Sequence, residues 1–106
     1  MRLTYSEIRT LILVREHIKS NESHPIRLKV LVQDFEIPEK KLRGGFRYYL
    51  KDTVQRYSLT HSMMYAKDLL GKGCTIKEVA AILKYSNTAN FRRAFKRFFG
   101  YYPRSE

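Results

Sequence analysis

Apolar residues recur along the whole chain at the spacing of helices, and short stretches of polar residues, proline and glycine separate the apolar segments. The spacing predicts a helix in each of these segments, and no segment has the alternation that is typical of a strand. The predicted helices cover residues 4–19, 27–35, 38–50, 53–71, 75–83 and 87–99. The pattern therefore indicates an all-α fold.

Most of these segments have an apolar face that we expect to point into the core. The expected core residues are Ile8, Leu11, Ile12 and Ile18 in the first helix, Leu42, Phe46 and Tyr49 in the third, Leu59, Met63, Ala66 and Leu70 in the fourth, and Phe91, Phe95 and Phe98 in the sixth. Helix boundaries carry their own signals. Thr4 with Glu7 and Thr75 with Glu78 have the spacing of capping boxes, and the glycines of residues 71–73 predict a helix end.

A pattern of two short helices around a tight turn occurs twice in the chain. In each copy an apolar helix precedes a polar turn, and the helix after the turn carries two apolar residues one helical turn apart, followed by a basic residue. The copies are Val32-x3-Glu36-Ile37-Pro38 with Leu42-x3-Phe46-Arg47, and Ala80-x3-Lys84-Tyr85-Ser86 with Phe91-x3-Phe95-Lys96. This arrangement is typical of a helix-turn-helix, whose second helix lies in the major groove of DNA.

The second helix of each copy has a basic face opposite its apolar face. The outward residues are Lys40, Arg43, Gly44, Arg47 and Lys51 in the first copy, and Ala89, Arg92, Arg93 and Lys96 in the second. An arginine on such a face can bind O6 and N7 of guanine with two hydrogen bonds, and a basic residue near a helix end can neutralise a phosphate. A solvated surface explains a single basic helix equally well, but two such helices, each after an apolar helix and a turn, favour DNA binding.

The charge of the chain indicates a polyanionic partner. Lys and Arg number 21 against 10 acidic residues, so that the formal net charge is +11, a balance that suits DNA, RNA or an acidic membrane surface. No apolar run approaches the ~18 residues of a membrane span, and we expect no signal peptide. The single cysteine excludes an internal disulfide and fits a reducing compartment. We therefore expect a cytoplasmic protein that associates with the nucleoid through DNA.

The second copy carries a pattern that resembles a known family. Its residues are Ile76-Lys77-Glu78-Val79-Ala80, then Lys84-Tyr85-Ser86-Asn87-Thr88-Ala89-Asn90-Phe91-Arg92-Arg93-Ala94-Phe95-Lys96-Arg97, then Gly100 and Pro103. They are similar to the C-terminal signature of AraC/XylS-type bacterial transcription regulators. The resemblance implies an all-α domain of about seven helices, in which a long linker helix joins two helix-turn-helix subdomains. We expect the subdomains at residues 1–52 and 74–106 and the linker helix at 53–73.

Carried over by motif, the resemblance implies which residues read DNA bases. It places these positions at Lys40, Arg43 and Gly44 in the first unit and at Thr88, Ala89, Asn90, Arg92 and Arg93 in the second. We expect phosphate contacts from Arg47, Lys51, Lys96 and Arg97. A linker helix of this length spans ~30 Å, close to the ~34 Å between major-groove segments one turn apart. The two units are therefore expected to bind successive major-groove segments sequence-specifically and to regulate transcription.

Some residues depart from the pattern of the family. Glu36 and Lys84 stand at turn positions that are commonly glycine, Lys51 stands where a glycine usually follows the third helix, Ser62 replaces an arginine, and Tyr102 replaces a small hydroxyl residue. Family members usually carry a separate sensing or dimerisation domain, so we expect a monomeric fragment of a longer regulator. Its expected partners are double-stranded DNA and, in the full-length regulator, RNA polymerase.

Two other classes of function remain as alternatives. The charge also suits an RNA or single-stranded nucleic-acid binding module, with aromatic residues at 48–49, 63–65 and 101–102 as stacking platforms. A small nucleic-acid enzyme is the second alternative, but no nucleophile–base pair or acidic dyad stands out, so we expect no catalytic residue and no enzyme activity. We also expect no metal or cofactor, since metal-ligand spacing is lacking among His17, His24, His61 and Cys74.

Overall fold

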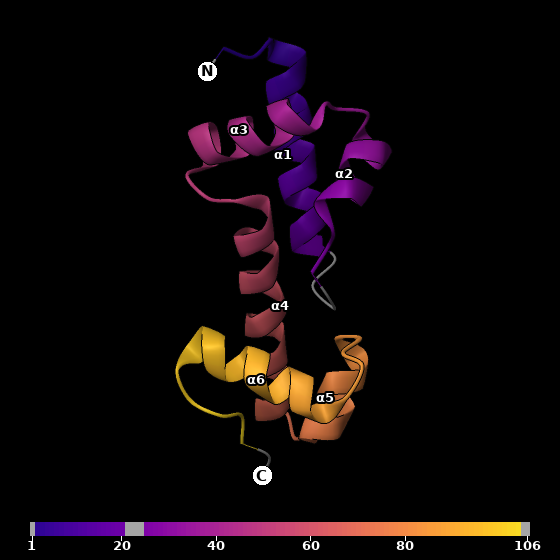
Figure 1. Ribbon diagram of the computed structural model, residues 1–106, viewed down its shortest axis with the longest axis vertical. Coiled ribbons are helices and arrows are strands. Elements are labelled where there is room, and N and C mark those ends of the chain that lie inside the picture. The colour runs from indigo at the N-terminus through magenta and orange to yellow at the C-terminus, as the bar shows by residue number, and fades with distance from the viewer. Residues whose placement is uncertain (1, 21–24, 105–106) are drawn as a thin grey trace.

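The computed structural model describes residues 2–20 and 25–104, and within these ranges it contains helices and no strands (Figure 1). The helices are α1 (Tyr5–Ser20), α2 (Leu28–Phe35), α3 (Glu39–Leu50), α4 (Val54–Gly71), α5 (Ile76–Ile82) and α6 (Thr88–Phe99). The all-α class expected from the sequence is confirmed. The described residues hold six helices where the resemblance implied about seven, because Gly100, with a φ of 87°, ends α6 and the residues from there to Arg104 are not helical.

Both capping boxes expected from the sequence are formed. The backbone N–H of Glu7 donates to the hydroxyl of Thr4 at 3.1 Å, and the backbone N–H of Thr4 donates to the carboxylate of Glu7 at 2.9 Å. Thr75 and Glu78 exchange the same two bonds, at 3.1 and 2.9 Å, at the start of α5. These bonds satisfy backbone donors that have no partner inside the helix.

The remaining helices differ in how they begin. α4 and α6 are capped by Thr53 and Asn87, whose side chains accept backbone N–H groups three residues further on at 3.0 and 2.8 Å. Arg27 and Pro38 precede α2 and α3, and neither provides a side-chain cap. The helix-turn-helix formed by α2 and α3 therefore depends more on packing than on local hydrogen bonds.

One apolar core lies among α1, α2, α3 and the start of α4, and we call it the N-terminal core. Its buried residues are Leu11, Val14, Ile18, Ile26, Leu31, Ile37, Leu42, Phe46 and Val54. Gly45 lies where α3 approaches α1, and a Cβ there would come within 2.7 Å of Leu3 Cδ1 and 2.8 Å of Leu11 Cδ1. The missing side chain therefore allows the close contact between these helices.

The predictions that Ile12 and Tyr49 lie in this core are wrong. Ile12 is 42% exposed, whereas Val14 is fully buried, because the buried stripe of α1 lies to one side of Ile12. Tyr49 is 37% exposed, because the end of α3 extends past α1 (Figure 1). Its ring packs edge-on against Tyr48, with 4.9 Å between ring centroids. Both residues lie at the margin of an apolar face, where the crossing angle of the neighbouring helix decides burial.

A second core, the C-terminal core, lies among the second half of α4, α5 and α6. Its buried residues are Met63, Ala66, Leu70, Val79, Ala80, Leu83, Phe91 and Phe95. Phe95, predicted to face the core, lies in this core together with Val79 and Leu83. Its ring lies 5.8 Å from that of Phe91 and 4.5 Å from that of Phe99, centroid to centroid. Leu59 and Phe98, also expected in the core, are partly buried at its margin.

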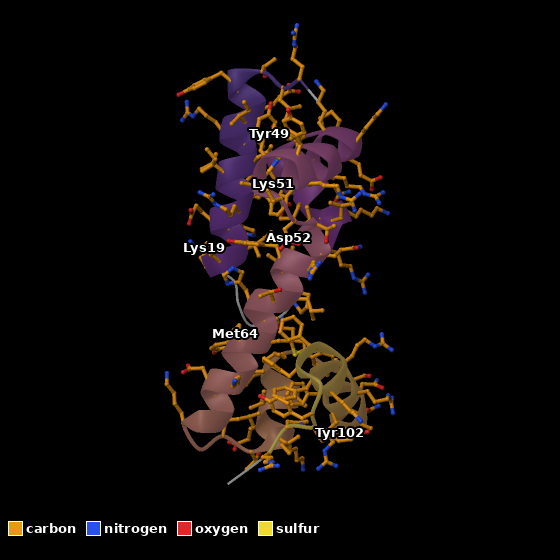
Figure 2. All side chains as sticks on the ribbon, turned by 90° about the vertical axis from the view of Figure 1, so that its left-hand side faces the viewer. Lys19, Tyr49, Lys51, Asp52, Met64 and Tyr102 are labelled. Atoms are coloured by element: carbon orange, nitrogen blue, oxygen red, sulfur yellow. The ribbon has the colours of Figure 1, made fainter. Side chains whose placement is uncertain are left out.

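The long helix α4 joins the two cores and gives the protein an elongated shape of 49 × 24 × 21 Å. α6 passes across the second half of α4 on the side toward the viewer in Figure 1, and α3 lies beyond the start of α4, where it passes across α1 on the same viewer's side (Figures 1 and 2). In the middle of α4, the hydroxyl of Ser58 is buried and accepts the backbone N–H of Ile26 at 2.8 Å. Ser62, the departure from the family pattern, is fully buried one turn later.

Candidate nucleic-acid interface

The basic face of α6 points to solvent. Its exposed residues among those predicted to contact DNA are Ala89, Arg92, Arg93, Lys96 and Arg97, and Thr88 and Asn90 are half-buried. On the opposite face Phe91 and Phe95 are 0% and 2% exposed. The aromatic core residues therefore fix the rotation of α6 so that its arginines can meet a partner.

A chain of hydrogen bonds orders the first turn of α6. The side-chain amide of Asn90 donates to the hydroxyl of Ser86 at 2.7 Å, and its oxygen accepts a hydrogen bond from the guanidinium of Arg93. The backbone N–H of Asn90 donates to the cap residue Asn87. Arg93 is therefore held against the turn that precedes its own helix.

The basic face of α3 borders a cleft of ≈ 580 Å³. Lys40, Arg43, Gly44 and Arg47 line this cleft together with Leu28, Glu39, Thr53, Val54 and Gln55. The four basic residues of the first unit, Lys40, Arg43, Arg47 and Lys51, are exposed, and Gly44 is half-buried. The structure thus brings together the residues that the sequence predicted for this unit, beside the start of α4.

Two charged residues of the first unit were missed by the sequence reasoning. Glu39 places its carboxylate 4.0 Å from the guanidinium of Arg43, and the i, i+4 spacing of this pair was a visible signal. Arg56 lines a smaller cleft of ≈ 350 Å³ with Arg47, Lys51, Asp52 and Thr53. Its position in the first turn of the predicted helix 53–71 was the signal that could have identified it. Arg56 adds a positive charge beside the N-terminal end of α4, which attracts anions.

The turns of both units have the left-handed backbone conformation that favours glycine, although neither contains glycine at that position. Glu36 has a φ of 50° in the first turn, and Lys84 has a φ of 63° in the second. Lys51 has a φ of 60° after α3. At these three positions the chain therefore has another residue where the family commonly has glycine, but its backbone has the conformation that glycine favours. In the second turn Tyr85 packs against Phe91 at 5.6 Å between centroids, and burial raises the pKa of its phenol.

Several of the tyrosines considered as stacking platforms have a cation over the ring or a second ring against it. The ammonium of Lys51 lies 5.3 Å from the ring centroid of Tyr48, and that of Lys96 lies 4.7 Å from the centroid of Tyr102. Met63 is fully buried in the C-terminal core. Tyr48, Tyr49, Tyr101 and Tyr102 nevertheless remain 51%, 37%, 48% and 55% exposed, so the single-strand alternative stays open.

Within the described ranges no three His, Cys, Asp or Glu side chains are grouped so that they could hold a metal ion. His17 packs on Phe35 at 5.5 Å and His61 packs on Tyr57 at 4.6 Å, centroid to centroid. Cys74 is a free, half-buried thiol, and His24 lies outside the described residues. No described helix combines the length and the apolar character that crossing a membrane requires.

Comparison with known families identifies the fold that these helices form. Residues 31–105 match the family described as "Helix-turn-helix domain", of AraC type. The chain belongs to this AraC-type helix-turn-helix family. It is a family of DNA-binding domains of transcription regulators and not a class of enzymes.

Relatives and solved structures agree with this assignment. Over 90 residues the chain is 29% identical to the HTH-type transcriptional regulator GbdR in two strains of Pseudomonas aeruginosa, UCBPP-PA14 and PAO1. The match covers 84% of this chain and 24% of the relative, so the chain spans about a quarter of the length of these curated relatives.

Two solved structures share the fold. The C-terminal domain of AraT, a response regulator from Geobacillus stearothermophilus, has a TM-score of 0.81 at 21% identity, over 97% of this chain and 84% of that one. A "probable AraC family transcriptional regulator" from Rhodopseudomonas palustris CGA009 has a TM-score of 0.70 at 22% identity, over 90% and 91% of the two chains.

Proposed function

We propose that this AraC-type domain binds double-stranded DNA sequence-specifically and that α3 and α6 enter successive major-groove segments on one face of the duplex. The observation that supports the proposal most is that the two basic helices lie toward opposite ends of the elongated molecule and on the same side of it, the side that faces the viewer in Figure 1. In a full-length bacterial regulator this binding would direct the control of transcription.

The length of α4 is consistent with this geometry. α4 has 18 residues, and a helix of that length spans ~27 Å, whereas adjacent major-groove segments lie ~34 Å apart. α3 lies beyond the start of α4, to which the segment 51–53 connects it, and this placement adds to the separation of the two reading helices. A modest bend of the DNA toward the protein would close any remaining difference.

Within this proposal the residues divide by their place on the two helices. Base-reading roles are proposed for Lys40, Arg43, Gly44, Thr88, Ala89, Arg92 and Arg93, and phosphate contacts for Arg47, Lys51, Lys96 and Arg97. The proposal also assigns a phosphate contact to Arg56, because it shares a cleft with Arg47 and Lys51. Asn90 was expected to read a base and is treated separately below.

Salt dependence tests the nature of the partner. A duplex would be selected from a random library, and its affinity would be measured by fluorescence anisotropy over a range of salt concentrations. Neutralisation of about 5–8 phosphates gives a log–log slope of about −5 to −7. Single-stranded DNA and RNA of the same length, at matched salt, are expected to bind more weakly. A slope shallower than about −2, or equal affinity for RNA, would contradict the proposal.

A footprint tests the use of both units. Hydroxyl-radical cleavage of the selected duplex should show two protected segments about 10 base pairs apart on one face. Protection confined to about 5 base pairs would mean that a single unit engages the DNA.

We further propose that the chain is monomeric, that it acts at the nucleoid in the cytoplasm, and that the full-length regulator contacts RNA polymerase. The net charge of +11 opposes self-association, and the curated relatives are much longer than this chain. Sedimentation tests the monomer. The molecular mass should be that of one chain at low and at moderate salt, and a larger mass at low salt, where the charges repel most, would contradict the proposal.

A further inference from the structure

We infer that Asn90 is a positioning residue that orients Arg93 for base reading, with Ser86 as the second support, and that Asn90 does not itself read a base. The inference rests on the proposed function of α6. Asn90 in the first turn of α6 and Ser86 just before the helix would then help to set the base specificity of Arg93.

Both polar atoms of the Asn90 side chain are hydrogen-bonded within the protein. Its amide nitrogen donates to Ser86 Oγ at 2.7 Å, its amide oxygen accepts from Arg93, and its backbone N–H donates to Asn87. An asparagine that reads adenine needs its oxygen and its nitrogen together, for N6 and N7 of the base. The bonds to Ser86 and Arg93 fix the plane of the half-buried Asn90 amide, so that turning this plane toward a base would break them.

Arg93 gains from the same contacts. A guanidinium has five N–H donors in a planar fork, and the bond to Asn90 leaves donors free for O6 and N7 of a guanine. Arginine loses much rotamer freedom when it is fixed in one orientation. The bond from Arg93 to Asn90 fixes part of that orientation before DNA arrives, so that less freedom is lost on binding.

Asn90 beside Arg93 differs in charge from Glu39 beside Arg43 in the other unit, because the amide of Asn90 is neutral. Arg43 of α3 lies 4.0 Å from the carboxylate of Glu39, whose negative charge competes with phosphate for the arginine. Asn90 orients Arg93 and leaves the positive charge of the guanidinium uncompensated. The geometry of α6 thus combines orientation with full electrostatic attraction for DNA.

A double-mutant cycle tests the inference. Wild type, Asn90→Ala, Arg93→Ala and the double variant would be titrated with the preferred duplex and with every single-base variant of it, at one salt concentration. Asn90→Ala should weaken the preferred duplex about 2- to 13-fold, the factor for ordering one rotamer-rich side chain. Its discrimination should fall at the same base pair as that of Arg93→Ala. In the Arg93→Ala background, Asn90→Ala should change affinity by less than about 2-fold.

Ser86 provides a second, milder variant at an exposed site. Ser86→Ala removes the acceptor of the Asn90 amide and should reduce discrimination at the same base pair, whereas Ser86→Thr keeps the hydroxyl and should restore it. Thermal unfolding of each variant shows whether a loss of discrimination comes from a misoriented Arg93 or from an unfolded domain. If Asn90→Ala does not fold, the comparison of Ser86→Ala with Ser86→Thr tests the inference.

The outcomes separate this inference from the proposed function. A wild-type domain with no base preference overturns both. A wild type with a base preference, in which Asn90→Ala affects a different base pair or lowers affinity equally with and without Arg93, overturns the inference alone.

Discussion

The two helix-turn-helix units have the same order of helices but differ in what holds their reading helices. α6 begins at the Asn87 cap, and the hydrogen bonds of Asn90 order its first turn. α3 begins after Pro38, which provides no side-chain cap, and it is positioned by the close packing of Gly45 on α1. Local hydrogen bonds add to the core contacts at the start of α6, whereas the start of α3 relies on tertiary contacts, so the two units should respond differently to substitution.

The largest expected effect comes from the two cores. Phe46→Ala and Phe95→Ala each remove a buried aromatic ring, and each should lower the free energy of unfolding by about 3–5 kcal/mol. Because the cores share no buried residue, hydrogen exchange should show the loss of protection mainly in the unit that carries the substitution. Equal loss in both units after either substitution would show that α4 couples them into one cooperative structure.

The next comparison concerns the two reading arginines. Arg93→Ala and Arg43→Ala should each cost about 1–3 kcal/mol of binding free energy and relax specificity at one base pair. The loss for Arg43 should lie at the lower end, because Glu39 already opposes part of its charge. Lys96→Ala is the matched control, and it should weaken all duplexes equally and reduce the salt slope by about 1. Uniform losses for both arginines on a panel of single-base variants would remove the base-reading role.

Glycine substitutions compare the two turns. Glu36, Lys51 and Lys84 have a positive φ, which costs an L-residue roughly 1–2 kcal/mol, whereas glycine loses about 0.5–1 kcal/mol through its greater freedom in the unfolded chain. Glu36→Gly, Lys51→Gly and Lys84→Gly should therefore each raise the free energy of unfolding by about 0.5–1 kcal/mol. Thermal melts would measure the gain, and a destabilised Lys84→Gly would show that its side chain contributes more than its backbone conformation costs.

The smallest expected effect is the pH dependence of the two capping boxes. The hydrogen bond from Lys41, followed by the backbone N–H of Thr4, lowers the pKa of Glu7, and the backbone N–H of Thr75, followed by its hydroxyl, lowers the pKa of Glu78. A carboxyl group whose pKa is lowered in the folded state stabilises the fold at pH values above the ordinary pKa of glutamate. This stabilisation is lost as the pH falls through the lowered pKa. NMR titration should show that salt raises the pKa of Glu7 more than that of Glu78, because the partner of Glu7 is a mobile surface charge.

The same difference between the units explains how much could be predicted from the sequence. The capping boxes and the Phe91–Phe95 pair are local patterns, and each formed as expected. The exposure of Tyr49 depends on where α3 ends relative to α1, and a helical period does not contain that information. Asn90 was predicted to face DNA, but its place in the hydrogen bonds of the first turn depends on the position of Ser86 across that turn.

The length of α4 determines how α6 is rotated about the axis of α4 relative to α3. Each residue inserted between Ser58 and Ser62 would rotate α6 by about 100° relative to α3, so that a single insertion turns one reading helix away from the face the other occupies. Seven inserted residues make about two turns, restoring the face to within about 20° while separating the units by ~10 Å more. That distance is about three base pairs at ~3.4 Å each. Because the duplex completes one turn in about 10 base pairs, three more base pairs would turn the second half-site about 100° away from the protein. A longer α4 of this kind should therefore lose one of its two contacts with the DNA.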